Sequence, residues 1–254
     1  PVLLIIAFAG IAASQLLGPG AAEAPLGRHD NPRTPPWFLG AEFVHASPWL
    51  VSTALAIATL SGSAAVWLGL SGRWRPDPRR AIAAGVLATA VFALLPPIGS
   101  ADPLSYAADG RIAAIGHNPW KETPAQLAAT GDPVGQAVEV PWKTTPSVYG
   151  PIASGEQALA AKVAGTDVAL TVLLLDLAGG LVFIAVALLL HWTAHDDEAR
   201  RRAVVVWVAN PLLWLQLVAG AHLDVLAAVA ALGAVLAAAR SRLAAGALAG
   251  AAAA

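Results

Sequence analysis

The sequence predicts an all-α fold, a polytopic bundle of transmembrane helices. Of its 254 residues, 57% are hydrophobic and only 12% are charged, whereas a soluble domain carries about 25% charged residues. Apolar runs long enough to cross a bilayer recur along the chain. Lys and Arg also concentrate in short connections between these runs, a pattern typical of cytoplasmic loops. These three observations predict a multi-pass protein of the cell membrane.

Six apolar runs meet or approach the roughly 20 residues that a helix needs to cross a hydrocarbon core of about 30 Å. They are 2–18, 49–70, 81–99, 168–192, 203–220 and 223–239, and a seventh begins at Leu243 and is cut off by the end of the sequence. No basic segment or cleavage site precedes the first run, which favours a membrane span over a signal peptide. We interpret residues 1–254 as a single transmembrane domain, the N-terminal part of a longer protein.

The orientation follows from the basic residues. The short connections 72–80, 193–202 and 240–242 hold nine of the fifteen Lys and Arg residues: Arg73, Arg75, Arg79, Arg80, Arg200, Arg201, Arg202, Arg240 and Arg242. The other six are spread over the longer connections 19–48 and 100–167. The positive-inside rule therefore predicts that the short connections are cytoplasmic and the long ones extracytoplasmic.

Composition also excludes several classes of partner. A net charge of −1 argues against nucleic acid, because binding a phosphate backbone requires a concentrated basic surface. The absence of cysteine excludes disulfides and thiolate metal sites, and we expect no cofactor. Membrane lipid is the expected partner.

The outer connection 100–167 is too long to be a simple loop. Its aromatic residues, including Trp120 and Trp142, are suited to packing against a membrane surface. We expect two amphipathic helices, 104–115 and 153–163, lying along the membrane interface with turns between them.

Asp102 lies where the third apolar run is expected to emerge from the membrane on the outer side. A carboxylate at this boundary stays ionised within reach of a membrane-bound substrate, and is suited to act as a general base on a sugar hydroxyl. The alternative is that Asp102 caps the following helix, with Ser105 completing a local turn.

Further polar residues follow on the same segment. Arg111 is suited to binding a phosphate, to pairing with Asp109 or to contacting lipid head groups. His117 and Asn118 are candidates to contact sugar or phosphate. Trp120 would stack on a sugar face or lie in the aromatic belt of the interface.

A second polar group, His222 and Asp224, lies between the fifth and sixth apolar runs. Helix capping by Asp224 and an interfacial location of His222 are the alternatives to a site, and the group is too small to indicate a metal. Within the fourth run, Asp176 is a functional candidate by default. We expect it to form a structural hydrogen bond to Asn210 or to another helix, and Pro211 to kink the fifth run.

These residues form an ordered set that resembles the polyprenol-phosphomannose-dependent alpha-1,6-mannosyltransferases of lipomannan elongation, members of the GT-C superfamily. The set comprises Asp102-Pro103, Tyr106, Gly110-Arg111, Gly116-His117-Asn118-Pro119-Trp120, Ser147-Val148-Tyr149-Gly150-Pro151-Ile152, Asn210-Pro211 and Gly220-Ala221-His222-Leu223-Asp224. The chain departs from the expected pattern at Leu223, where Asn is expected, and at Trp120, where Tyr is expected.

The resemblance implies a GT-C-like bundle that transfers mannose, with inversion, from polyprenyl phosphomannose to a growing alpha-1,6-mannan glycolipid on the outer face. It implies Asp102 as general base, and Arg111 and His222 as groups that hold the donor phosphate. The substrate-binding set that we expect is Tyr106, Asp109, Arg111, His117, Asn118, Trp120, Tyr149, His222 and Asp224. Family members are about twice this length, so further residues are expected to complete the site.

Three alternatives stay open. A GT-C transferase using another polyprenyl-phosphate sugar, arabinose or glucose, is the nearest. A secondary transporter would also be polytopic, but transporters place their sites near the midplane and contain internal repeats, which this sequence lacks. A non-catalytic scaffold would leave the outer polar residues unexplained.

Overall fold

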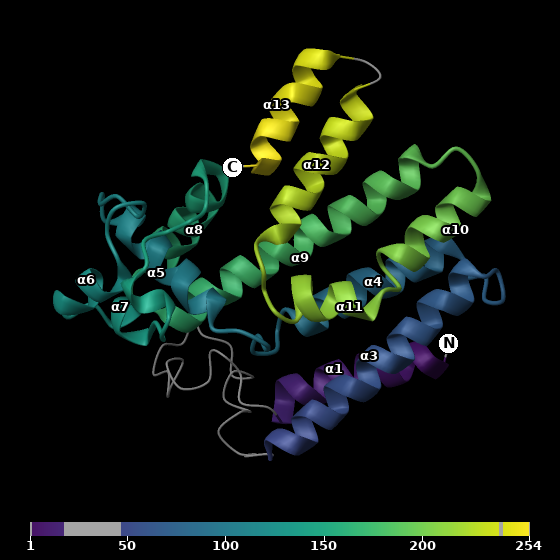
Figure 1. The fold of residues 1–254 in the computed structure, drawn as a ribbon, viewed down its shortest axis with the longest axis horizontal. Helices are drawn as coiled ribbons and strands as arrows, with labels where there is room; N and C mark the ends of the chain where they lie inside the picture. Colours follow the sequence, from purple (N-terminus) through teal and green to yellow (C-terminus); the bar gives the residue numbers. More distant parts are fainter. Residues whose placement is uncertain (1, 18–46, 239–240, 254) are drawn as a thin grey trace.

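The computed structural model describes residues 2–17, 47–238 and 241–253, and their regular secondary structure is entirely helical (Figure 1). The helices are α1 (Val2–Leu17), α3 (Pro48–Leu70), α4 (Pro78–Phe92), α5 (Asp102–Ala114), α6 (Pro124–Ala129), α7 (Pro133–Ala137), η2 (Trp142–Thr144), α8 (Pro151–Ala164), α9 (Val168–Thr193), α10 (Asp197–Val206), α11 (Pro211–Leu213), η3 (Trp214–Val218), α12 (Asp224–Ala238) and α13 (Arg242–Ala253). The predicted all-α class is confirmed. Nearly all of the predicted connection 19–48 lies outside the described residues.

Among the described residues, two helices are long and apolar enough to cross a membrane, α3 with 23 residues and α9 with 26. At about 1.5 Å per residue they measure roughly 35 and 39 Å, more than a hydrocarbon core of about 30 Å. The apolar helices α1 and α12 are shorter. The structure is therefore consistent with a helical membrane protein, and six complete spans stay a prediction.

The helices α3, α4, α9 and α10 begin at side-chain caps. Ser47, Asp77, Asp167 and Asp196 each accept a hydrogen bond from a backbone N–H of the first turn, of α3, α4, α9 and α10 respectively. Pro at the first helical position of α3 and α4 has no N–H to leave unsatisfied there. Polar residues next to apolar runs thus define where the long helices begin.

The third and fifth apolar runs do not form continuous helices as predicted. α4 ends at Phe92, because Pro96 and Pro97 follow and cannot donate backbone hydrogen bonds. In the fifth run α10 ends at Val206, and Asn210 caps a new helical segment that begins at Pro211 and continues as the π-helix η3. Pro211 therefore starts a helix instead of kinking one.

The broken fifth run carries Trp214 into the centre of the bundle. Its indole Nε1 donates to the carbonyl oxygen of Val208 at 2.6 Å, which satisfies a group freed by the break. The rings of Phe8, Phe92 and Phe183 lie with their centroids 5.2, 5.6 and 5.1 Å from it. This aromatic cluster joins α1, α4 and α9 around one buried side chain.

Residues 100–167 form a helical lobe at one end of α9, and the α3–α4 and α9–α10 turns lie at the opposite end (Figure 1). The hairpin of α12 and α13 projects from the side of the bundle. The lobe and the two arginine-rich turns thus occupy opposite ends of the bundle, as the predicted topology requires, and their placement relative to a membrane stays a prediction.

The two helices predicted within the lobe both form, but only one is a surface helix. α5 is buried along almost its whole length, from Pro103 to Gly110 and at Ile112, so the expectation that it lies along the membrane interface is wrong. α8 packs against it and exposes the apolar side chains of Ile152, Leu159 and Val163. α5 is the central helix of the lobe, and α8 covers it.

Candidate active site

Asp102 is the first residue of α5, and its side chain does not cap the helix. The N-cap position is Ala101, which makes no side-chain capping bond, so the capping interpretation of Asp102 is wrong. Ser105 does complete the local turn, because its hydroxyl donates to the Asp102 carbonyl oxygen at 2.8 Å. The Asp102 carboxylate faces His222 instead, with Oδ2 3.5 Å from the ring Nδ1.

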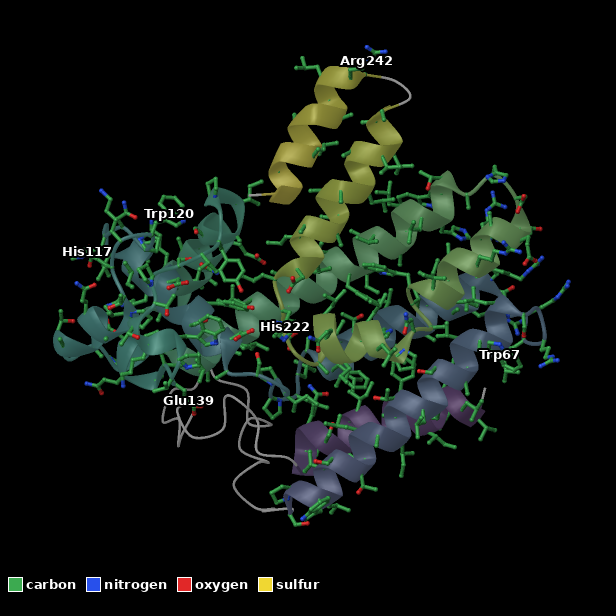
Figure 2. All side chains as sticks on the ribbon, viewed as in Figure 1. Trp67, His117, Trp120, Glu139, His222 and Arg242 are labelled. Atoms are coloured by element: carbon green, nitrogen blue, oxygen red, sulfur yellow. The ribbon has the colours of Figure 1, made fainter. Side chains whose placement is uncertain are left out.

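His222 reaches the lobe from the segment between η3 and α12 (Figure 2). Its Nδ1 also lies 3.5 Å from the hydroxyl of Tyr106. Ala221, the preceding residue, has a φ of 51°, a conformation that is rare for residues other than Gly. A Cβ at Gly220 would meet the imidazole Cδ2 at 2.8 Å. The backbone at 220–221 is thus shaped to hold the imidazole against α5.

Tyr106 and Tyr149 extend this group. The Tyr149 hydroxyl donates to the Tyr106 hydroxyl at 3.1 Å, and the two rings are perpendicular with centroids 5.2 Å apart. The pKa of each phenol is raised above its ordinary value, mainly by burial. The negative charges of Asp102 and Asp224 raise both pKa values further. Both side chains therefore stay protonated at neutral pH and available as hydrogen-bond donors.

Asp109 lies on the same face of α5 as Asp102, two helical turns further on. It is buried, and burial raises the pKa of its carboxyl to about 7, while a hydrogen bond with Ser147 opposes the shift. Both carboxylates line a pocket of about 30 Å³ together with Ser105, Ser147 and Tyr149. A space of this size holds about two water molecules.

Arg111 is bound within the lobe and does not pair with Asp109. Its Nε donates to Oδ2 of Asp132 at 2.8 Å, and Oδ1 of Asp132 accepts from the Val134 N–H at the start of α7. Of the three alternatives given for Arg111, pairing with Asp109 is therefore wrong. This ion pair ties α5 to α7, which gives Arg111 a structural role in the lobe.

His117, Asn118 and Trp120 do not join the group around His222 either. Figure 2 shows His117 and Trp120 on the far side of the lobe from His222. His117 pairs with Glu122 at 2.7 Å, and Asn118 accepts from the Trp120 backbone N–H at 3.0 Å. Trp120 Nε1 donates to the Tyr149 carbonyl oxygen at 2.6 Å, so this residue positions Tyr149 through its backbone.

Asp176 is buried in α9, and neither of its carboxylate oxygens has a hydrogen-bond partner among the described residues. The Asn210 amide donates to the Val206 carbonyl oxygen and accepts from the Leu212 N–H. The expected hydrogen bond between Asp176 and Asn210, or from Asp176 to another helix, is therefore wrong.

The group formed by Asp102, Tyr106, Asp109, Tyr149 and His222 offers carboxylates that can accept a proton, beside phenol donors and an imidazole. The side chain of Asp224 is exposed, and its negative charge contributes to the raised pKa of both phenols. Within the described part of the chain, no three His, Asp or Glu side chains are arranged to hold a metal ion. The chemistry available here is proton transfer and hydrogen bonding to an anionic or hydroxylic ligand.

Comparison with known protein families matches residues 7–254 to the N-terminal domain of the alpha-(1->6)-mannopyranosyltransferases. The chain belongs to this family. A probable alpha-(1->6)-mannopyranosyltransferase of Mycolicibacterium smegmatis is 32% identical over 197 residues, 70% of this chain and 34% of the relative. An alpha-(1->6)-mannopyranosyltransferase of Mycobacterium tuberculosis is 31% identical over 137 residues, 52% of this chain and 23% of the relative. No solved structure matches.

The match to the alpha-(1->6)-mannopyranosyltransferase N-terminal domain includes every residue of the group around His222. The chain spans about a third or less of the length of these two curated relatives. The resemblance recognised from the sequence motifs is thereby confirmed at the level of the family.

Sequence reasoning assigned no site role to Ser105, Ser147 or Asp132. Ser105 was detectable, because it lies one turn from Asp102 on the face that also carries Asp109. Ser147 precedes Tyr149 in a segment already part of the motif set, but only the fold brings it to Asp109. Nothing in the sequence pairs Asp132 with Arg111, because Asp132 is the N-cap of α7, 21 residues beyond Arg111 of α5.

Proposed function

We propose that this alpha-(1->6)-mannopyranosyltransferase domain carries the catalytic base of an inverting transferase on the extracytoplasmic face of a multi-pass membrane protein. The donor would be polyprenyl phosphomannose and the acceptor a growing alpha-1,6-mannan glycolipid, a precursor of lipomannan. The observation that carries the proposal is the contact of the Asp102 carboxylate with His222, a residue 120 positions away, beside two phenols.

The proposed reaction is one displacement. The acceptor hydroxyl oxygen attacks the anomeric carbon of mannose from the side opposite the phosphate, and its proton passes to the Asp102 carboxylate. The bond between the anomeric carbon and the phosphate oxygen breaks, and polyprenyl phosphate leaves with the electron pair. One displacement inverts the anomeric configuration, and no nucleotide sugar takes part.

Tyr149 is assigned to the leaving group, whereas His222 lies 3.5 Å from the Asp102 carboxylate and is assigned to positioning the base. Donors directed at the phosphate oxygens stabilise the charge that develops as the glycosidic bond breaks. The resemblance implied that Arg111 and His222 hold the donor phosphate. Arg111 is engaged by Asp132 and His222 lies beside the base, so Tyr149 takes this role in the proposal. Asp109 and Ser147 are placed to hydrogen-bond a sugar hydroxyl across the small pocket.

Lipid-linked substrates fit the surroundings of the group. The lobe lies against α9, a helix of membrane length, and α8 exposes apolar side chains at its surface. A polyprenyl chain in the membrane would bring its phosphate and sugar to the membrane boundary, which is where we place Asp102. Arabinose or glucose carried on the same lipid would reach the same group, so the choice of sugar needs a direct measurement.

The test compares Asp102→Asn with wild type in the full-length protein, using labelled polyprenyl phosphomannose and a mannan glycolipid acceptor. A general base contributes about 10² to 10⁴ in rate, so we expect a loss of at least about 10² with thermal stability unchanged. Glu122→Gln removes a carboxylate on the far side of the lobe and should retain wild-type activity.

Retention of more than about a tenth of the rate by Asp102→Asn would refute the assignment of the base, since it is well short of a base's usual contribution. Polyprenyl phosphoarabinose and phosphoglucose, tested in parallel, decide the sugar. Transfer from either in preference to the mannose donor would replace the proposed substrate.

A further inference from the structure

An apolar groove runs between α1 and α4, beside the α3–α4 turn at the end of the bundle opposite Asp102. It has a volume of about 920 Å³, near the upper end of the range for ligand pockets, about 300–1,000 Å³. Small and apolar residues of α1 and α4 form its walls, including Ala9, Ala12, Ala84 and Ala88. The aromatic cluster at Trp214 forms its floor. A linear hydrocarbon chain matches this shape and polarity.

The groove ends in a basic mouth. Arg75 and Arg80 line it there, next to Trp74. Asp77 is the acidic residue of the lining, and its carboxylate already accepts from the Arg80 backbone N–H at 2.8 Å as the cap of α4. Neither guanidinium forms an ion pair with a carboxylate of the described residues.

The arginines of the neighbouring helix differ in this respect. On α10, Arg200 pairs with Asp197, and both Arg201 and Arg202 pair with Glu198. The cations at the groove mouth, unlike those of α10, therefore have no carboxylate partner among the described residues and are available to an external anion. Trp74 beside them suits the boundary between head groups and hydrocarbon.

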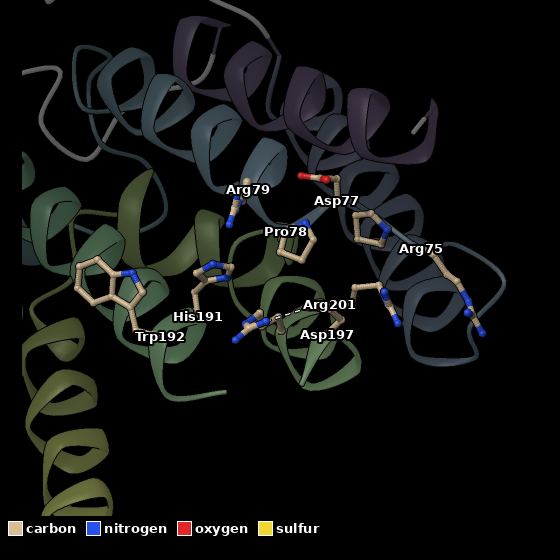
Figure 3. Close-up of a pocket in the computed structure, with 10 residues that line it drawn as sticks. Arg75, Asp77, Pro78, Arg79, His191, Trp192, Asp197 and Arg201 are labelled. Atoms are coloured by element: carbon tan, nitrogen blue, oxygen red, sulfur yellow. Dashed lines mark hydrogen bonds and ion pairs between the residues drawn. The ribbon is translucent and has the colours of Figure 1, made fainter. Parts of the chain in front are cut away.

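A second, polar pocket adjoins the mouth (Figure 3). It is lined by Arg75, Arg79, His191, Trp192, Arg200 and Arg201, among others, and shares Arg75, Pro76 and Asp77 with the groove. Its volume is about 840 Å³. The groove thus opens onto a wider basic surface, whose field attracts anions at the same end of the molecule.

We propose that the groove binds an anionic phospholipid of the leaflet that faces the arginine-rich turns. One acyl chain lies between α1 and α4, and the phosphate accepts hydrogen bonds from the forked guanidinium groups of Arg75 and Arg80. Basic pockets between membrane helices on the cytoplasmic side bind lipid head groups by this combination of charge and apolar packing. The site is separate from the proposed transfer reaction and lies at the other end of the bundle.

A helix from another part of the protein is the competing occupant of the groove. It would cover the apolar walls but would also need to supply a counter-charge to two arginines at the mouth. An anionic lipid provides both parts in one molecule, and it is abundant at this surface. The charge at the mouth is what favours the lipid.

The test measures which lipid the purified full-length protein retains after its lipid has been exchanged for phosphatidylglycerol or for phosphatidylcholine. The retained lipid is detected by native mass spectrometry. We expect preferential retention of phosphatidylglycerol. One basic residue near an anionic surface contributes about 1 kcal/mol, so Arg75→Gln and Arg80→Gln should each weaken retention about fivefold. Arg202→Gln removes a paired arginine from the same end of the molecule, outside the groove, and should retain the preference.

A second pair of variants tests the apolar part. Ala84→Phe places a ring in the groove and should abolish retention, whereas Ala83→Phe adds the same ring to an exposed neighbour that does not line it. If Ala84→Phe fails to fold, the arginine variants still test whether the groove binds an anionic lipid. A wild-type protein without preference for the anionic lipid, or equal losses in Arg202→Gln and Arg80→Gln, would overturn the proposal.

Discussion

Asp102 and Asp109 show how one helix face places two carboxyl groups in different surroundings. Asp102 is partly exposed and touches an imidazole, whereas Asp109 is 4% exposed and has its pKa raised to about 7 by burial. Burial that raises the pKa of a carboxyl group suits it to hold a proton, a role different from that of a base. Here the partly exposed group is the proposed base, and the buried group is protonated over part of the neutral range.

The burial of Asp109 predicts a pH dependence of stability. Its pKa rises from 3.8 to about 7 on folding, so between these values the folded state binds more protons than the unfolded state. Stability therefore falls as the pH rises through this window, by up to about 1.4 kcal/mol per pH unit for one group. Asp109→Asn should raise the melting temperature at pH 8 and leave it nearly unchanged at pH 4, as measured by thermal unfolding in detergent.

The matched control is Glu122→Gln, which removes a partly exposed carboxylate of the same lobe and should leave most of the slope in place. Part of the slope should persist in Asp109→Asn, because burial also raises the pKa of Glu156 to about 7. A melting temperature for Asp109→Asn that follows wild type across the whole pH range would contradict the burial argument.

At the scale of single elements, α5 and α8 depend on a glycine at their contact. A Cβ at Gly110 would collide with the backbone carbonyl of Gln157, which has no room to move within α8. Gly110→Ala should therefore cost about 1–3 kcal/mol, the usual range for overpacking a core. Because α5 carries Asp102 and Tyr106, transfer activity should fall together with thermal stability.

Gly155→Ala is the matched substitution on α8, where the added Cβ meets nothing within 4 Å. It should raise stability by about 0.5–1 kcal/mol, since Gly is unfavourable inside a helix. If the two substitutions gave the same change in melting temperature, the close contact at Gly110 would have no energetic consequence, and the motif glycine would need another explanation.

Prolines account for the elements that hydropathy misplaced. The runs 81–99 and 203–220 are predominantly apolar, but Pro96, Pro97 and Pro211 remove the backbone donors that a continuous helix needs. A sum of side-chain hydropathies does not register a missing N–H. The position of each break was therefore readable from the prolines, while the π-helix at Trp214–Val218 depends on how Trp214 packs against three other rings.

For the whole molecule, the predicted topology can be tested with single cysteines, because this chain has none. Val140→Cys in the lobe and His195→Cys in the α9–α10 turn are both exposed positions. In intact cells expressing a version without other cysteines, a membrane-impermeant maleimide should label Cys at 140 and not at 195. Labelling at 195 should appear only after the membrane is permeabilised.

The reverse pattern would place Asp102 in the cytoplasm and overturn the proposed reaction together with the orientation. It would also move the groove between α1 and α4 to the outer leaflet. Equal labelling at both positions in intact cells would show that the lobe and the arginine-rich turns lie on one side, against the positive-inside assignment.

The sequence by itself determined the helical class and the family, and its set of candidate residues included those that the structure brings together around His222. Composition, apolar runs and ordered motifs are local properties, and they identified Asp102, Tyr106, Asp109, Tyr149 and His222 without coordinates. The tertiary structure alone decided that Arg111 forms an ion pair with Asp132, that α5 is buried, and that Asp176 lacks the hydrogen bond expected for it. These outcomes depend on which helices pack together, and packing between distant segments leaves no periodic signal in the chain.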